Sequence, residues 1–315
     1  MSSFVRTTGF QRLAVTTAVL SLVLVAIGGA VRATDSGLAC PTWPGCFYAG
    51  DFLPPAGLNV WLEHSHRLLA GVVGVLIAVQ AFWAIARYRR RAWIVWPSVI
   101  AAVAVVVQAG LGALVVLHLL RAELVTAHLG LGMLVVGCLI MIAVNASPAR
   151  PAQAASPGFA RAAAGVTALT LLQILVGGHV TGTAAGLVYK GGPLFGVFSV
   201  TPLSTAPHAY NLAHRVLAVL VAAAVMWLIV QARRSSQQGW LLRLPRIAAW
   251  LVVVQIAIGV GNLASDLSFL TVIPHLAVAS WIWGVLVLET VLACRSASGP
   301  DAEPAVAQQQ QGVAA

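Results

Sequence analysis

The chain has 315 residues, of which 60% are hydrophobic and only 8% are charged. Soluble domains carry roughly a quarter charged residues, so this composition excludes an ordinary soluble protein and predicts that lipid surrounds most of the chain. The net charge of +10 does not indicate a nucleic-acid partner, because the basic residues sort by side of the predicted membrane.

Eight uncharged apolar runs are long enough to cross a bilayer, which takes about 20 residues. They lie near residues 12–31, 66–86, 94–117, 125–145, 162–181, 212–232, 246–264 and 273–293. We therefore expect an all-α integral membrane protein with eight transmembrane helices. The first run is expected to be a retained helix rather than a cleaved signal peptide, because it has a counterpart later in the chain.

The basic residues predict the orientation of these helices, because lysine and arginine are retained on the cytoplasmic side. With the N-terminus inside, the cytoplasmic segments contain most of them, including Arg87 and Arg233. The outer loops contain Arg32, Arg121 and Lys190. We expect both termini to be cytoplasmic and the protein to span the cell membrane.

Landmarks of the first half of the chain recur in the second half at an offset of 147 to 149 residues. The matched pairs are His66 and His214, His128 and His275, Gly28 and Gly177, and Gly112 and Gly259. They predict two pseudo-repeated four-helix bundles in the same orientation, at residues 1–145 and 161–295. Residues 146–160 are predicted to form a cytoplasmic linker. Residues 296–315 are predicted to be a disordered cytoplasmic tail, because their composition cannot bury a core.

Four of the eight histidines form two equivalent pairs, His66 with His128 and His214 with His275, and each is expected to open a helix at its outer end. Neutral imidazole is a common metal ligand, and the second and fourth helices of a bundle face each other across its core. Each pair is therefore predicted to ligate one haem iron from opposite faces. The alternative is that each histidine is a hydrogen-bonded polar residue of the bundle. Zinc is less favoured, because a structural zinc site normally takes four protein ligands.

The remaining histidines, which are His64, His118, His179 and His208, have no histidine counterpart in the other half. We expect them to be interface residues or to lie behind the metal ligands. Arg67 and Arg215 each follow a predicted ligand, and their guanidinium groups suit the carboxylates of haem propionates. The alternative is that both side chains extend to the outer lipid headgroups.

The two halves differ in one carboxylate, because Glu63 lies three residues before His66 whereas Asn211 lies three residues before His214. A carboxylate beside a bound haem is a candidate for proton transfer or for stabilising positive charge. The alternative for Glu63 is an ion pair with Arg67.

A pair of cysteines also belongs to the first half alone. Cys40 and Cys46 share one predicted outer loop, in a compartment where a disulfide can persist. Their spacing permits a disulfide, and we favour a structural role for the pair over a redox role. The chain contains no Cys-x-x-Cys-His motif, so covalent attachment of a c-type haem is not indicated.

These features together resemble the haem A synthase family over residues 10–294. The residues that carry the resemblance are Glu63, His66, Arg67, Cys40, Cys46, His128, His214, Arg215 and His275. The resemblance implies that a methyl group of haem O is oxidised to the formyl group of haem A, with oxygen from water, for use in terminal oxidases.

The resemblance also implies a role for each half. His66 and His128 would hold the substrate haem O, with Glu63 as the catalytic carboxylate. The C-terminal half would hold a haem b that accepts electrons, between the ligands His214 and His275. The cysteine pair matches the family's disulfide, Cys40–Cys46.

Two other functions fit part of the sequence. A diheme b-type cytochrome that carries electrons from quinol explains four paired histidines but leaves Glu63 and the cysteine pair unexplained. A haem transporter would favour ligands at several depths, whereas these four are expected at one depth. The sequence leaves open the electron acceptor and whether a haem O synthase or an oxidase assembly factor binds to the protein.

Overall fold

The structure is a computed structural model that describes residues 8–48, 53–54, 56–147, 155–191, 199 and 205–297. The described residues form eight long α-helices and one short 3-10 helix, with no strand among them. The elements are α1 (Gly9–Ala33), α2 (Leu58–Arg87), α3 (Ala92–Leu117), α4 (Ala122–Asn145), α5 (Pro157–Gly182), η1 (Ala185–Leu187), α6 (Ala206–Arg234), α7 (Trp240–Ala264) and α8 (Phe269–Ala297).

All eight helices are long and apolar enough to cross a membrane, which confirms the eight predicted spans. Several helices begin well before the predicted runs: α2 begins at Leu58 and α6 at Ala206. The expectation that His66 and its three equivalents open their helices was therefore wrong. The apolar run starts later than the helix because the outer end of α2 contains two polar residues, Glu63 and His64. Both are buried, and both contact the preceding loop.

Two helices extend into segments that were predicted to be linker and tail: α5 begins at Pro157, and α8 ends at Ala297. Ser156 caps α5 by accepting a hydrogen bond from the Phe159 N–H at 3.1 Å, and proline suits the first helical position because it needs no hydrogen-bond donor there. As a result α5 begins at Pro157, inside the predicted linker. Residues 148–154 of that linker, and residues 298–315 of the predicted tail, lie outside the described residues.

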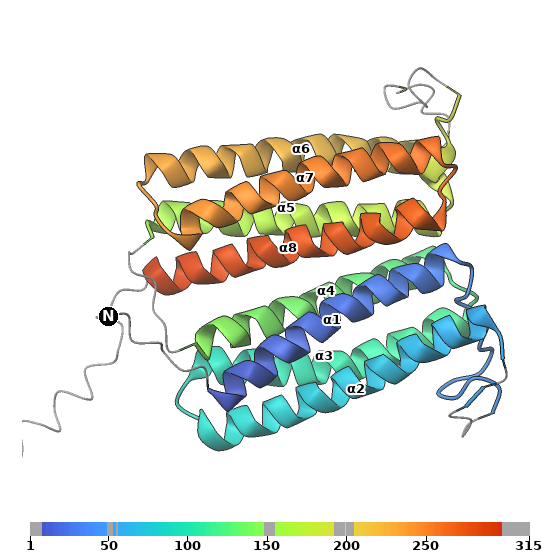
Figure 1. The fold of residues 1–315 in the computed structure, drawn as a ribbon, viewed down its shortest axis with the longest axis horizontal. Coiled ribbons are helices and arrows are strands. Elements are labelled where there is room, and N and C mark those ends of the chain that lie inside the picture. Colours follow the sequence, from blue (N-terminus) through green and yellow to red (C-terminus); the bar gives the residue numbers. More distant parts are fainter. Residues whose placement is uncertain are drawn as a thin grey trace, which may run out of the picture.

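The helices lie in two groups, α1–α4 and α5–α8 (Figure 1). Within each group consecutive helices are in contact and the first helix also contacts the fourth. This order places α2 diagonally across from α4, and α6 diagonally across from α8. The two groups meet through α1, α4, α5 and α8.

Each group has its own buried apolar core, and a third cluster lies between them. Ile77 and Leu139 are buried in the first group, and Val225 and Leu286 in the second. Between the groups, α4 packs closely on α8, because a Cβ atom added at Gly137 would lie 2.8 Å from the Trp283 ring. Small residues at such contacts let membrane helices approach each other closely.

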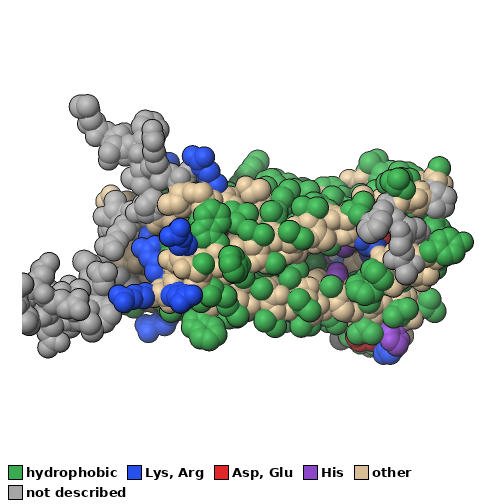
Figure 2. All heavy atoms as spheres, turned by 90° about the horizontal axis from the view of Figure 1, so that it is seen from below, with side chains coloured by type: hydrophobic (Ala, Val, Ile, Leu, Met, Phe, Trp, Pro, Cys, Tyr) green, Lys and Arg blue, Asp and Glu red, His purple; other side chains and the backbone are tan. Residues whose placement is uncertain are grey.

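Figure 2 shows how side-chain types are distributed on one face of the molecule. Hydrophobic side chains cover its middle, and most of the visible lysine and arginine side chains gather toward one end. Histidine side chains are visible toward the other end, one of them inside a hollow. The two ends of the helical bundle are therefore chemically different.

Candidate functional site

Four histidines lie at matching depths, near the end of the bundle at which α1 connects to α2 and α5 connects to α6. Each is about two turns inside its helix, in α2, α4, α6 and α8 respectively. The four residues are His66, His128, His214 and His275, and all four are half-buried. The structure thus places every predicted haem ligand at one end of the bundle.

Each of these rings packs against a glycine of the preceding helix. A Cβ atom added to these glycines would lie 3.1 Å from His66 Nε2 at Gly28, 3.2 Å from His128 Cε1 at Gly112, 2.8 Å from His214 Cε1 at Gly177 and 3.2 Å from His275 Cε1 at Gly259. Such distances are shorter than ordinary van der Waals contact. The glycines therefore provide the space in which the imidazoles sit, in the same way in both halves.

Within each half the two histidines come from helices that lie diagonally across the group, His66 and His128 from α2 and α4, and His214 and His275 from α6 and α8. One ring nitrogen in each pair, Nδ1 of His128 and Nδ1 of His275, is buried without a hydrogen-bond partner. A neutral imidazole can bind a metal ion through either of its ring nitrogens. The residues present therefore fit two bis-histidine haems, one in each helix group.

Glu63 and Arg67 connect the outer end of α2 to the loop that precedes it. Glu63 is buried and forms an ion pair with Arg67, the alternative that the sequence left open for Glu63. Its other oxygen, Oε2, accepts a hydrogen bond from the Cys40 N–H at 2.7 Å. Arg67 also donates to the carbonyl oxygens of Cys40 at 2.9 Å and of Thr42 at 2.6 Å, and to that of Gly45. The Arg67 guanidinium thus holds the loop through the loop's backbone carbonyl groups.

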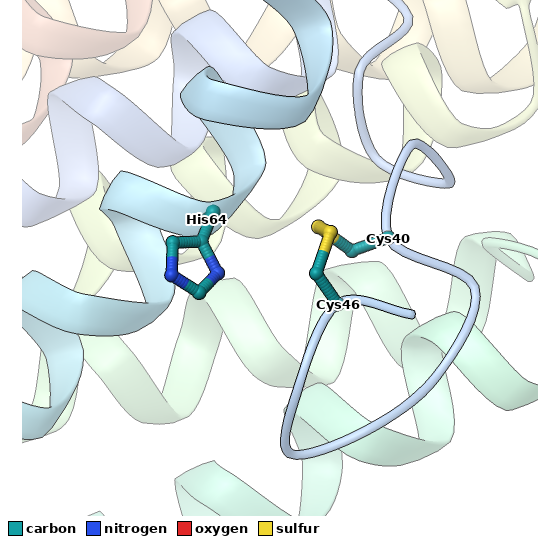
Figure 3. Close-up of side chains that lie close together, drawn as sticks. All are labelled: Cys40, Cys46 and His64. Atoms are coloured by element: carbon teal, nitrogen blue, oxygen red, sulfur yellow. A yellow bond between two sulfur atoms is a disulfide. The ribbon is translucent and has the colours of Figure 1, made fainter. Parts of the chain in front are cut away.

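The loop is closed by a disulfide between Cys40 and Cys46, with an S–S distance of 2.01 Å. Both cysteines are fully buried. His64 faces the disulfide from α2 (Figure 3), and its ring lies within 4.8 Å of both sulfur atoms. His64, which the sequence placed behind the ligands or at an interface, packs against the disulfide.

The second half holds the corresponding loop with other groups. Asn211 is buried and donates to the carbonyl oxygens of Ala185 at 2.7 Å and Gly186 at 3.2 Å. Arg215 donates to the Ser199 carbonyl at 3.1 Å, and its guanidinium carbon lies 4.8 Å from the centre of the Tyr189 ring. Equivalent positions therefore hold an outer loop in each half, but only the first half has a carboxylate there.

The other histidines lie around this end of the bundle. The ring of His179 lies edge-on to Tyr210 at a centroid distance of 4.6 Å, and His208 lies edge-on to Tyr189 at 5.1 Å. His118 follows the last residue of α3. None of these three packs against the glycines that seat the paired histidines.

Two glutamines near the paired histidines were not recognised as site residues from the sequence. Gln108 donates to the backbone carbonyl of His128 at 2.8 Å. The side-chain nitrogen of Gln173 lies 3.1 Å from Nδ1 of His214. Their signal in the sequence was a polar amide within an apolar run, where such residues are costly and usually have a partner.

The fold and the site define an α-helical multi-pass membrane protein with two histidine pairs suited to haem. Residues 11–58 and 57–287 match the model of a family described as cytochrome oxidase assembly protein. The chain belongs to this family.

Several relatives are similar over most of their length. The chain is 29% identical to a heme A synthase of Symbiobacterium thermophilum over 289 residues, which are 87% of this chain and 92% of the relative. It is 28% identical to a heme A synthase of Shouchella clausii over 295 residues, or 91% of this chain and 98% of the relative. A heme A synthase of Parvibaculum lavamentivorans is 29% identical over 275 residues, covering 71% and 78% of the two chains.

Proposed function

We propose that the protein is a haem A synthase, which oxidises a methyl group of haem O to a formyl group and so provides haem A for terminal oxidases. One observation carries the proposal: two equivalent histidine pairs are present, and only the first has a buried carboxylate, Glu63, one turn away on the same helix. The names of the relatives, heme A synthase in each case, agree with it.

In the first half, His66 of α2 and His128 of α4 would hold the iron of the substrate haem O. Residues three apart on a helix share a face, so the Glu63 carboxylate lies on the same side of α2 as His66. Conversion of the methyl group to a formyl group removes electrons and protons and adds one oxygen atom, which comes from water. Glu63 accepts protons released at the methyl carbon and stabilises positive charge that develops there.

In the second half, His214 and His275 would hold a haem b, and that group would supply one-electron redox chemistry. With that group bound, this half would offer the electrons removed from the substrate a route to an electron acceptor outside the chain. Asn211 replaces the carboxylate here, and an amide neither accepts a proton nor carries charge at neutral pH. Residues 1–145 are thus the catalytic half and residues 161–295 the electron-accepting half, and the methyl oxidation is that of an oxidoreductase acting on a CH or CH3 group.

The location of the site follows from the same asymmetry. Most of the lysine and arginine side chains visible in Figure 2 gather at the end opposite the visible histidines, and basic residues are retained in the cytoplasm. The haem sites therefore lie near the outer face of the cell membrane, and both termini lie in the cytoplasm. A haem O synthase and oxidase assembly factors are candidate partners for the delivery of substrate and the removal of product.

A diheme cytochrome is less well supported, because two electron-carrying haems do not account for the difference between Glu63 and Asn211. The test is to express the chain in a host that makes haem O but no haem A, and to identify the extracted haems by chromatography with mass detection. We expect haem A from the wild type. Haem b alone, at two per chain, would support the cytochrome instead.

The role of Glu63 is tested in the same host with Glu63→Gln, which keeps an acceptor for the Cys40 N–H but removes the charge. Glu123→Gln is the matched control, because Glu123 is an exposed carboxylate at the same end of the molecule. We expect haem O to accumulate in Glu63→Gln and haem A to form normally in Glu123→Gln. Normal haem A formation by Glu63→Gln would remove Glu63 from the reaction.

A further inference from the structure

The proposed function requires opposite behaviour from two similar sites. The haem b of the second half is a resident cofactor, whereas the first half must bind haem O and release haem A in each reaction cycle. Both sites have the same axial residues and the same glycine seats. One place where two sites with the same ligands can differ in how firmly they hold a haem is the group that contacts the far side of each ligand ring.

In the second half, α5 contacts the ring of His214 at two successive turns. Gly177 seats the ring, and the amide of Gln173, four residues earlier on the same face, lies 3.1 Å from its Nδ1 atom. Residues four apart on a helix are neighbours. The ring is thus fixed both by close packing and by a polar contact.

In the first half, the residue four positions before the seating glycine Gly28 is Leu24. Leu24 packs against the apolar core of α1–α4 and has no group that can bond to a ring nitrogen. Within the part of the chain that the structure describes, no side-chain hydrogen bond reaches the ring of His66. The two halves therefore differ at this position as clearly as they do at Glu63 and Asn211.

The amide of Gln173 suits an imidazole that binds iron through Nε2, because Nδ1 then carries the proton and needs an acceptor. The Oε1 atom of Gln173 is buried and has no partner. Amide nitrogen and oxygen exchange places when the group turns about its last bond, and the two orientations have the same shape. Turning the amide in this way places Oε1 against Nδ1–H and satisfies both atoms.

We infer that Gln173 is a positioning residue for the resident haem: it holds His214 with Nε2 toward the iron and makes this site retentive, while Leu24 leaves the substrate site exchangeable. Hydrogen bonds behind metal-bound histidines typically change metal affinity by about 10- to 100-fold. They also make the imidazole a stronger electron donor, which favours the oxidised iron. This inference rests on the proposed assignment of haem b to the second half.

The first test is Gln173→Leu, which gives the second half the arrangement of the first. We expect haem b to dissociate roughly 10-fold faster from the purified protein and its midpoint potential to rise. The electron paramagnetic resonance g-values of the oxidised haem should shift, because they report the orientation and basicity of the axial rings. Gln173→Glu keeps an acceptor, so it should restore retention and bring the potential to or below the wild-type value.

The matched control is Gln108→Leu, because Gln108 bonds to the backbone carbonyl of His128 rather than to a ring. It should leave the potential, the spectrum and the retention of haem b unchanged. The reciprocal change, Leu24→Gln, should slow the release of haem A, so that more of it co-purifies with the protein. Wild-type potential, spectrum and haem retention in Gln173→Leu would overturn the inference.

His275→Ala separates a failure of this inference from a failure of the proposed function. Loss of haem b in His275→Ala together with wild-type behaviour of Gln173→Leu would overturn the role of Gln173 alone. Retention of haem b in His275→Ala, in contrast, would overturn the assignment of that haem to the second half, and the inference with it.

Discussion

Glu63 accepts a hydrogen bond from the backbone N–H of Cys40 at 2.7 Å, so the candidate catalytic carboxylate is joined directly to the disulfide loop. The same carboxylate is paired with Arg67, which donates to the loop at further carbonyl oxygens. The loop, the disulfide and the outer end of α2 therefore form one connected structure above the first histidine pair. Changes in the loop should be felt at the carboxylate.

Removal of the disulfide should weaken this structure and reduce haem A formation. A cross-link that closes a loop of this length contributes about 2 kcal/mol through the entropy of the unfolded loop. We expect the double variant Cys40→Ala, Cys46→Ala to show faster proteolysis within the loop and a lower yield of haem A. Cys138→Ala is the control, because Cys138 is a free cysteine in α4. An unchanged yield of haem A with a cleavable loop would show that the order of the loop does not matter for catalysis.

Arg67→Lys should release the loop even though the positive charge is kept. A lysine ammonium lacks the planar array of donors by which arginine reaches several acceptors at once, and here three carbonyls and a carboxylate share one guanidinium. We expect faster hydrogen exchange in the segment from Cys40 to Phe47, measured by mass spectrometry, and reduced haem A formation.

The same variant distinguishes the two roles considered for Arg67. If Arg67→Lys keeps the loop protected but loses affinity for haem O, the arginine acts on the propionates of the substrate. Arg215→Lys provides the comparison, because Arg215 donates to a loop carbonyl in the second half. It should leave exchange in the segment from Cys40 to Phe47 at the wild-type rate.

The sequence was sufficient for the eight spans and the common depth of the four paired histidines, because the length of an apolar run and the recurrence of a motif can both be seen in the sequence itself. It was not sufficient for the outer end of α2, where helix continues through Glu63 and His64. Polar residues there are stabilised by the loop folded over them, and this tertiary contact leaves no hydropathy signal. The bonds of Arg67 to the loop were missed for the same reason.

The candidate site was also only partly predictable. Gly28 and Gly112 were found as landmarks of the repeat, but their contacts with His66 and His128 follow from helix packing that a sequence pattern does not specify. Gln173 was missed because it has no counterpart in the first half, and a comparison of repeats keeps only positions that match. The most informative residues of this site are those at which the repeat fails.

The glycines that pack against the paired histidines should not tolerate a single added methyl group. They are Gly28, Gly112, Gly177 and Gly259. Gly112→Ala would place a Cβ atom 3.2 Å from the His128 ring, whereas Gly110→Ala, two residues earlier on α3, would meet nothing within 4 Å. We expect Gly112→Ala to lower the occupancy of haem O, and Gly110→Ala to leave it unchanged. Occupancy is measured as haem O per chain in the purified protein. Equal occupancy in both variants would mean that the His128 ring shifts without affecting its bond to iron.

Packing between the two halves should depend on Gly137. A Cβ atom there would lie 2.8 Å from the Trp283 ring, in the buried cluster between α4 and α8. Because overpacking a tight contact typically costs about 1–3 kcal/mol, we expect Gly137→Ala to lower the thermal unfolding midpoint in detergent. Gly165→Ala is the control, because its Cβ atom would meet nothing within 4 Å. Glycine is also less favourable than alanine in a helix by up to about 1 kcal/mol, so this control should unfold at the same or a higher temperature. A Gly137→Ala protein as stable as the control would show that α4 and α8 can move apart without loss of stability. The halves would then be held together by the contacts of α1 with α8 and of α4 with α5.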